Sequence, residues 1–292
     1  MIRYEGTLYR PPSEADSLIL QATIGCSWNR CTFCGMYRDK RFRVRPLAEL
    51  EAEVEAVAAA GLEPQKVFLA DGDALVARAA FLGELLDLLT DTWPGLRRVS
   101  CYASPQALQV RTVEEMADLR ARGLTLYYLG IESGHDEVLA ALDKGVTGDE
   151  MVAAAGKAHE AGVKLSTMIL LGAGGPELSF AHARASAEVV NRIQPRFVST
   201  LVTTPVPGTP LWAQAERGDW SCPPPLDLVR ELREFLAHLE LRSTVFRSNH
   251  ASNWLALAGR LPHDREALLA FLDEVLAHPE RAPFRPAALR GL

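Results

Sequence analysis

The chain has 292 residues, of which 48% are hydrophobic, enough for one large α/β domain or two small ones. Lys and Arg total 31 against 37 Asp and Glu, and the net charge of −6 provides no general attraction to nucleic acid or anionic membranes. Residues 1–17 lack the apolar segment of a signal peptide, and no apolar run reaches membrane-spanning length. We therefore expect a cytoplasmic protein whose five cysteines stay reduced.

Short apolar or β-branched runs alternate with longer segments of helical periodicity. Strands are predicted at 18–24, 66–70, 97–103, 124–131, 163–171 and 196–203. Helices are predicted between them at 46–61, 77–90, 112–123, 149–162 and 177–192. Six β-α units without a hairpin signal predict an α/β fold with a parallel sheet, either a barrel or an open doubly wound sheet.

The C-terminal part departs from this pattern. The proline-rich stretch "SCPPPLD" at 221–227 is a poor place for a regular element, and helical segments follow near 226–241 and 264–277. The polar stretch 246–255 between them predicts a loop. We expect an N-terminal segment at 1–17, a core domain at 18–220 and a helical C-terminal extension at 221–292.

Three of the five cysteines crowd into "GCSWNRCTFCGMY", directly after the first predicted strand. Cys26, Cys31 and Cys34 have C-x4-C-x2-C spacing, in a loop at the strand end that carries ligands in barrels and open sheets alike. Structural zinc takes four protein ligands, and an iron–sulfur cluster usually takes four cysteines. No histidine stands within the loop, and Cys101 and Cys222 are distant in sequence. Three thiolates therefore indicate a zinc site completed by a distant residue, as in a zinc-stabilised binding module, or a cluster with one open iron.

The loop resembles the cluster loop of the radical S-adenosylmethionine (SAM) superfamily. That family commonly has C-x3-C-x2-C spacing with an aromatic residue before the last cysteine, and Phe33 matches it, although this chain has one extra residue between the first two cysteines. The resemblance implies a partial (β/α)6 TIM-like barrel and one [4Fe–4S] cluster on Cys26, Cys31 and Cys34, with SAM on the fourth iron. It also implies reductive SAM cleavage to a 5′-deoxyadenosyl radical, hydrogen abstraction from an unidentified substrate, and an electron donor such as flavodoxin or ferredoxin.

Four later segments match this superfamily, in particular its methylthiotransferase-like and oxygen-independent coproporphyrinogen oxidase-like members. They are "ADGDAL" at 70–75, "YLGIESGHDEVL" at 128–139, "MILLGAGGPE" at 168–177 and "TTPVPGTPL" at 203–211. By resemblance the first meets the SAM amino group, the second places an acid on the ribose hydroxyls, and the backbone of the third flanks adenine. Helix caps or ordinary turns are the alternatives for the single segments. The implied SAM-binding residues are Phe33, Gly72, Asp73, Glu132, Ser133, Ile169, Leu171 and Gly172.

Some features remain open after this comparison. The basic run at 37–45 is interpreted as a solvated face, with an anionic substrate as the alternative, and the net charge argues against nucleic acid as a partner. Lys144 matches a "KG" element of the relatives, but a surface lysine is the simpler interpretation. A nicotinamide-dependent reductase is disfavoured because Glu177 breaks the G-x-G-x-x-G pattern. The catalytic residues are not predicted.

Overall fold

The computed structural model describes residues 2–291 and divides into two compact units. The first unit comprises the chain up to Asn29, Met36–Leu129 and Ala153–Leu165, and the second comprises Arg30–Gly35, Gly130–Val152 and the chain from Ser166 onward. The division falls inside three elements, β6 (Leu124–Glu132), α6 (Gly148–Glu160) and β7 (Lys164–Leu171). The domain boundaries predicted at 17/18 and 220/221 stay predictions.

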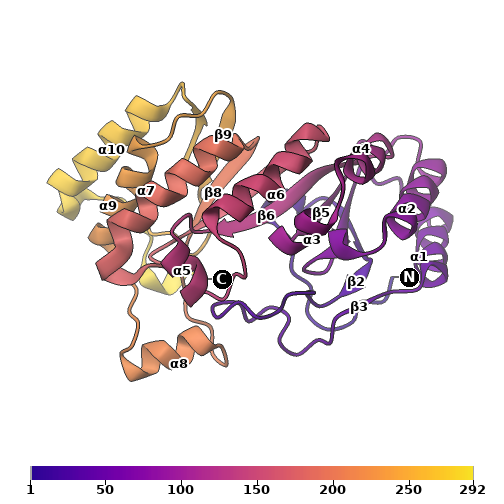
Figure 1. Cartoon of the computed structure of the whole chain (residues 1–292), viewed down its shortest axis with the longest axis horizontal. Helices are drawn as coiled ribbons and strands as arrows, with labels where there is room; N and C mark the ends of the chain where they lie inside the picture. The colour runs from indigo at the N-terminus through magenta and orange to yellow at the C-terminus, as the bar shows by residue number, and fades with distance from the viewer. Residues whose placement is uncertain (1, 292) are drawn as a thin grey trace. The chain divides into compact units, whose positions relative to one another are not determined.

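The first unit contains parallel strands in the order β1, β4, β5, β6, with helices packed on them (Figure 1). The strands and helices not yet bounded are β1 (Leu18–Gln21), β2 (Thr23–Ile24), β3 (Arg43–Val44), β4 (Lys66–Ala70), β5 (Arg98–Ala103), α1 (Leu47–Ala59), α2 (Ala79–Thr92), α3 (Pro105–Val110), α4 (Val113–Ala121) and the 3-10 turns η1 (Pro12–Glu14) and η2 (Ala74–Val76). The short strands β2 and β3 pair antiparallel beside this sheet.

Local sequence explains these elements. The β4 run "KVFLA" is almost wholly apolar, and its last four residues are buried, as expected for a parallel strand covered on both faces. The helix α2 buries Leu82, Leu85, Leu86 and Leu89 at helical spacing. Thr112 and Glu115 form a capping box that begins α4.

The second unit contains β7, β8, β9 and β10 in that order, parallel except for β10, which runs antiparallel to β9. Its helix α7 packs against α9, and α9 packs against α10 (Figure 1). The remaining elements are β8 (Phe197–Val202), β9 (Thr244–Ser248), β10 (Leu257–Leu261), α5 (Asp136–Ala141), α7 (Gly175–Ile193), α8 (Pro210–Arg217), α9 (Pro225–Ala237), α10 (Arg265–Ala277), η3 (Pro279–Arg281) and η4 (Ala287–Leu289).

The structure confirms the α/β class, and each predicted strand and helix has a counterpart. Two differences stand out. The predicted first strand is interrupted at Ala22 and becomes β1 and β2, which pair with different partners. The C-terminal extension contains α9 and α10 as predicted, but also β9 and β10, and β9 takes up Phe246–Ser248 of the predicted loop. Both strands are five residues long, and pairing decides their place: β9 pairs with β8, and β10 pairs with β9.

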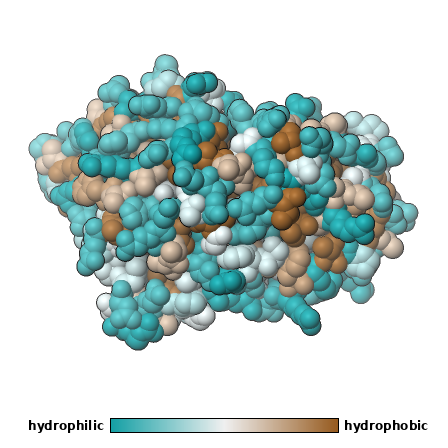
Figure 2. Space-filling model, viewed as in Figure 1, coloured by the Kyte–Doolittle hydropathy of each residue, from teal (hydrophilic) through white to brown (hydrophobic). Residues whose placement is uncertain are grey.

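The surface bears mostly hydrophilic residues on the face drawn in Figure 2, with hydrophobic residues scattered among them. Within residues 2–291, every helix is too short or too polar to cross a membrane.

Candidate functional site

Cys26 follows β2 and lies against the turn after β4, where Gly72 was predicted to meet SAM. The N–H of Gly72 donates to the carbonyl of Gly25 at 3.0 Å. A Cβ added to Gly72 would lie 2.5 Å from the ring of Tyr37 and 2.9 Å from the Cβ of Cys26. The structure therefore brings Gly72 and Cys26 together, and only glycine fits at this point of contact.

Asp71, which sequence analysis missed, fastens this turn to the cysteine loop. Its side chain is fully buried, and Oδ2 accepts hydrogen bonds from Gln21 Nε2 at 3.0 Å, the Gly25 N–H at 2.9 Å and Lys40 Nζ at 2.9 Å. Lys40 Nζ also donates to the Thr7 carbonyl at 2.7 Å. The ion pair replaces the water that both charged groups would otherwise need.

The basic run at 37–45 is therefore only partly the solvated face that we expected. Lys40 and Arg45 are buried, whereas Arg38, Arg41 and Arg43 are exposed. Arg45 makes a bidentate ion pair with Glu53, at 3.0 and 2.9 Å. Two charges of the run thus belong to the folded structure and cannot also bind an anionic substrate.

Asp73 is buried, and its carboxylate joins two loops. Oδ1 accepts the Ser104 N–H at 2.9 Å, and Oδ2 accepts the hydroxyls of Ser104, at 2.7 Å, and of Ser27 in the cysteine loop. Ser104 in turn caps α3 by accepting the Ala107 N–H. Asp73 precedes η2 without capping it through its side chain, so the alternative of a simple cap does not describe this residue.

Cys31 and Cys34 belong to the second unit, in a tight turn in which the Cys34 N–H donates to the Cys31 carbonyl at 3.2 Å. Backbone bonds hold Thr32 on both sides, from its N–H to the Leu142 carbonyl at 2.9 Å and from the Leu211 N–H to its carbonyl at 3.0 Å. Phe33 packs on a small core cluster made of Val138, Leu142, Leu170 and Ala173. Its aromatic ring thus anchors the C-x2-C turn.

The three cysteines are all half-buried. Cys26 belongs to the first unit, and Cys31 and Cys34 to the second. Among residues 2–291, no three His, Cys, Asp or Glu side chains stand together as a ready-made metal site. The ligand set of Cys26, Cys31 and Cys34 therefore stays a prediction.

Glu132 lies at the end of β6, as predicted, with a left-handed backbone at φ 66°. Its Oε1 accepts Lys144 Nζ at 3.0 Å, and both side chains are about nine-tenths buried. The surface interpretation of Lys144 is therefore wrong. A Cβ on Gly130 would collide with the Glu132 carboxylate, so the "GIE" sequence leaves room for the acid to fold back over its own strand.

Ser133 follows Glu132 and is fully buried. Its hydroxyl accepts the His135 N–H at 2.9 Å and lies 2.7 Å from Nδ1 of His182 on α7. Nε2 of His182 is 3.0 Å from the Leu170 carbonyl, which requires the proton on Nε2 and makes Nδ1 an acceptor. Burial lowers the pKa of His182 to about 4, which keeps the imidazole neutral.

The turn after β7 begins with Gly172. The side chains of Ile169 and Leu171 are buried in the core, so only their backbone could face a ligand, as the resemblance implied. The Gly172 N–H donates to Glu231 Oε1 of α9 at 2.6 Å. Burial raises the pKa of Glu231 to about 7. Sequence analysis missed Glu231, although it falls on the apolar stripe of α9 with Leu228, Leu232 and Phe235, where a charged residue is a signal.

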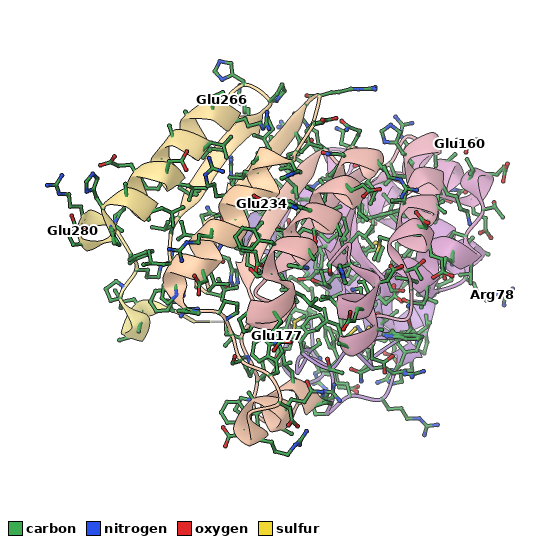
Figure 3. All side chains as sticks on the ribbon, turned by 60° about the vertical axis from the view of Figure 1, so that its left-hand side comes forward. Arg78, Glu160, Glu177, Glu234, Glu266 and Glu280 are labelled. Carbon is green, nitrogen blue, oxygen red and sulfur yellow. The ribbon has the colours of Figure 1, made fainter. Side chains whose placement is uncertain are left out.

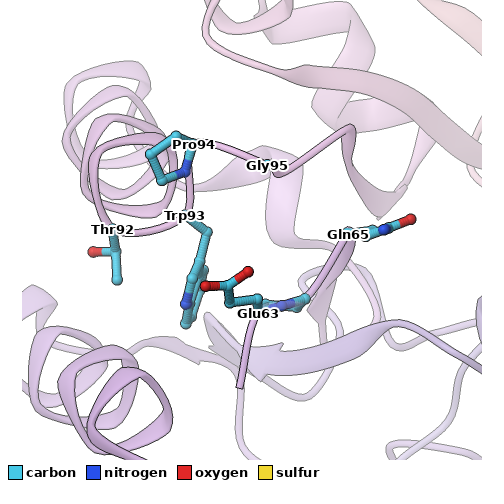
Figure 4. Close-up of a pocket in the computed structure, with 7 residues that line it drawn as sticks. Glu63, Gln65, Thr92, Trp93, Pro94 and Gly95 are labelled. Atoms are coloured by element: carbon cyan, nitrogen blue, oxygen red, sulfur yellow. The ribbon is translucent and has the colours of Figure 1, made fainter. Parts of the chain in front are cut away.

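One cavity of about 350 Å³ opens in the first unit, between the loops that precede β4 and β5 (Figure 4). Its lining contains none of the predicted site residues: it consists of Glu63, Pro64, Gln65, Thr92, Trp93, Pro94 and Gly95. These loops lead into the amino ends of the strands, whereas ligands of α/β folds bind at the carboxyl ends. We assign it no role in the reaction.

Glycine turns with a buried carboxylate in them or bonded to them thus lie at the carboxyl ends of β4, β6 and β7, and thiols follow the first strands, as in ligand-binding enzymes of the α/β class. Residues 20–183 match the family described as the radical SAM superfamily. The chain therefore belongs to this superfamily, and the resemblance predicted from the cysteine loop is confirmed.

Several solved structures have a similar fold. Methylornithine synthase aligns with a TM-score of 0.56 and 16% identity, over 92% of this chain and 74% of that one. Coproporphyrinogen III oxidase from Escherichia coli, described as a radical SAM enzyme, aligns with a TM-score of 0.59 and 20% identity. The alignment covers 76% of this chain and 52% of that one. A radical SAM methyltransferase from Kitasatospora setae, with cobalamin and a [4Fe–4S] cluster bound, aligns with a TM-score of 0.54 and 20% identity. The alignment covers 69% of this chain and 39% of that one. The chain thus spans about half or less of the length of the last two, and no curated protein sequence matches it.

These likenesses confirm the partial-barrel α/β fold. Members of the superfamily use a [4Fe–4S] cluster and SAM, and the chain is an enzyme of this class whose substrate is unidentified. The individual SAM contacts predicted above were drawn from motifs, and they stay predictions.

Proposed function

We propose that this enzyme cleaves SAM reductively and uses the resulting radical to abstract hydrogen from a substrate. The observation that carries the proposal is the placement of the cysteines in a chain of the radical SAM superfamily. Cys26 lies against Gly72 in the turn after β4, and Cys31 and Cys34 form a tight turn of their own. The residues present suit the cofactors. The C-x2-C turn offers two half-buried thiols, those of Cys31 and Cys34. Because residue 72 is glycine, it places no side chain against Cys26, the third cysteine.

We assign Cys26, Cys31 and Cys34 as ligands of a [4Fe–4S] cluster. When bound, the reduced cluster would supply one electron to SAM, whose C5′–S bond breaks homolytically into methionine and a 5′-deoxyadenosyl radical. Abstraction of a hydrogen atom from the substrate would then give 5′-deoxyadenosine and a substrate radical.

The protein's own part is to hold the nucleoside. Gly72 would let the backbone approach the SAM amino group closely, and Glu132, oriented by Lys144, would accept hydrogen bonds from the ribose hydroxyls. The backbone of residues 169–172 would flank adenine. An electron donor such as flavodoxin or ferredoxin and an unidentified substrate complete the proposal.

The test is product formation after anaerobic reconstitution with iron and sulfide. With dithionite and SAM, we expect 5′-deoxyadenosine from the unmodified protein and none from Cys31→Ala. Cys101→Ala is the matched control, because Cys101 is buried in β5 and forms no part of the loop. A colourless protein containing one zinc, or product from Cys31→Ala, would overturn the proposal.

A further inference from the structure

A buried carboxylate of the C-terminal extension lies directly behind the turn that we assign to adenine. Glu231 of α9 is fully buried, its Oε1 accepts the Gly172 N–H at 2.6 Å, and its Oε2 accepts the hydroxyl of Ser179 on α7. Figure 3 shows the two helices with Glu177 near the start of α7 and Glu234 on α9. A buried carboxylate is tolerated only where hydrogen bonds replace its water, and both oxygens meet that need.

The same part of the chain also confines Gly172 sterically. Gly172 has φ 78°, and an added Cβ would lie 3.0 Å from Pro223 Cδ and 3.0 Å from Leu228 Cδ2. Its N–H is held by Glu231, and its carbonyl accepts the Gly175 N–H at 3.0 Å. The shape of the turn is therefore fixed by residues 223–231 as much as by β7.

Further polar contacts lead from Glu231 toward the turn after β6, which we assign to the ribose of SAM. His182 Nε2 lies 3.6 Å from Glu231 Oε1 and donates to the Leu170 carbonyl. Its Nδ1 accepts the hydroxyl of Ser133, the neighbour of Glu132. Hydrogen bonds through His182 thus join the turn after β6 to the end of β7, and Glu231 packs against the same imidazole without a hydrogen bond to it.

We infer that Glu231 is a positioning residue for SAM, whose ionised carboxylate holds the turns after β6 and β7 in the shape that binds the nucleoside. The inference rests on the proposed function, because both turns are assigned there to SAM. It adds a control of SAM affinity that lies in the C-terminal extension, outside every motif matched to the superfamily.

The surroundings leave Glu231 to titrate near neutral pH. Burial raises its pKa to about 7, whereas burial lowers the pKa of His182 to about 4 and raises that of Cys222 to about 11. The charged groups nearby on the packed elements are Arg290, which interacts electrostatically with Cys222, and two ion pairs. These are Arg184–Glu234, with an exposed arginine, and Arg233–Asp273, with a partly exposed one. A hydrogen bond to an ionised carboxylate is about twice as strong as one to a neutral acid. The turn is therefore held most firmly above pH 7 and loosens as the pH falls below 7.

The experiment measures the Kd of SAM for the reconstituted protein between pH 6 and pH 8.5. Glu231→Gln keeps an acceptor for Gly172 but removes the charge, and Glu234→Gln is the control on the same helix. Between pH 8 and pH 6, we expect the SAM affinity of the unmodified protein to fall about fivefold more than that of Glu231→Gln. Ser179→Ala removes a bond that lowers the pKa of Glu231, so it should shift the midpoint of this difference to higher pH.

The outcomes separate the two claims. Parallel pH profiles for the unmodified protein and Glu231→Gln, with SAM bound by both, would overturn the role of Glu231 and leave the proposed function standing. Failure of the unmodified protein to take up a cluster or SAM would overturn the proposed function itself. Three results together would establish the positioning role. The pH profiles of the unmodified protein and Glu231→Gln diverge, the midpoint shifts in Ser179→Ala, and Glu234→Gln keeps the profile of the unmodified protein.

Discussion

Gly72 is a residue at which a single methyl group should decide whether the cluster loop forms. A Cβ there would meet the Tyr37 ring and the Cys26 Cβ, and neither is the far end of a flexible side chain. We predict that Gly72→Ala costs about 1–3 kcal/mol of local strain and lowers the iron content after reconstitution. Gly95→Ala is the matched control, because nothing lies within 4 Å of its added Cβ. Equal iron uptake by both variants would show that the loop does not depend on this contact.

Lys144 and Glu132 form a second test at the scale of single residues. Because both side chains are about nine-tenths buried, Lys144→Met should leave a carboxylate without its cation and lower the free energy of unfolding by on the order of 3 kcal/mol. Denaturant unfolding measures this change, and the exposed Lys164→Met should stay within about 0.5 kcal/mol of the unmodified protein. A similarly small change at Lys144 would mean that the ion pair does not form in solution.

The residues that sequence analysis missed share one physical property. Asp71, His182 and Glu231 are buried polar groups whose partners are 46 to 59 positions away or on another element, such as Gly25 for Asp71 and Gly172 for Glu231. Sequence patterns show spacing along the chain, so they led to the predictions for Cys26, Glu132 and Gly172 but not to the buried groups bonded to these segments. Lys144 was misjudged for the same reason, because exposure depends on the fold around it.

At the scale of elements, periodicity predicted the long helices and the parallel strands up to β8, whereas the short helices α3 and α8 were not predicted. Runs such as "KVFLA" and the leucine spacing of α2 carry their structure locally. The strands β9 and β10 were not predicted because a run of five residues has little intrinsic preference. Pairing with β8 decides the conformation of β9, and pairing with β9 decides that of β10.

The side chain of Asn253 stabilises this C-terminal addition to the sheet. Its Oδ1 accepts the Val202 N–H at 2.9 Å, and its Nδ2 donates to the Thr200 carbonyl at 2.7 Å, so it completes two backbone groups of β8. We predict that Asn253→Ala lowers the free energy of unfolding by about 2 kcal/mol, because the Thr200 carbonyl loses this donor and the Val202 N–H keeps only the Ser252 hydroxyl, at 3.1 Å. Asn249→Ala, at an exposed position of the same segment, should have little effect. Equal unfolding midpoints for the two variants would contradict this role.

At the scale of the whole molecule, the predicted α/β class and superfamily are confirmed, while the ligand set and the substrate are not determined by either the motifs or the fold. A fold shared at about 20% identity or less supports many reactions, so the substrate has to be found by chemistry on the isolated enzyme. Within the basic run, Arg38 and Arg41 are exposed and Arg43 pairs with Glu5, so an anionic substrate stays a prediction.

In the proposed function, Cys26, Cys31 and Cys34 hold a cluster whose remaining iron binds SAM. Electron paramagnetic resonance of the reconstituted and dithionite-reduced protein tests it most directly, with and without SAM, alongside iron analysis. We predict about four irons per chain, a spectrum of a reduced [4Fe–4S] cluster that changes when SAM is added, and loss of the signal in Cys26→Ala, Cys31→Ala and Cys34→Ala but not in Cys101→Ala. A cluster signal that SAM leaves unchanged, or that survives in any of the three loop variants, would contradict the account.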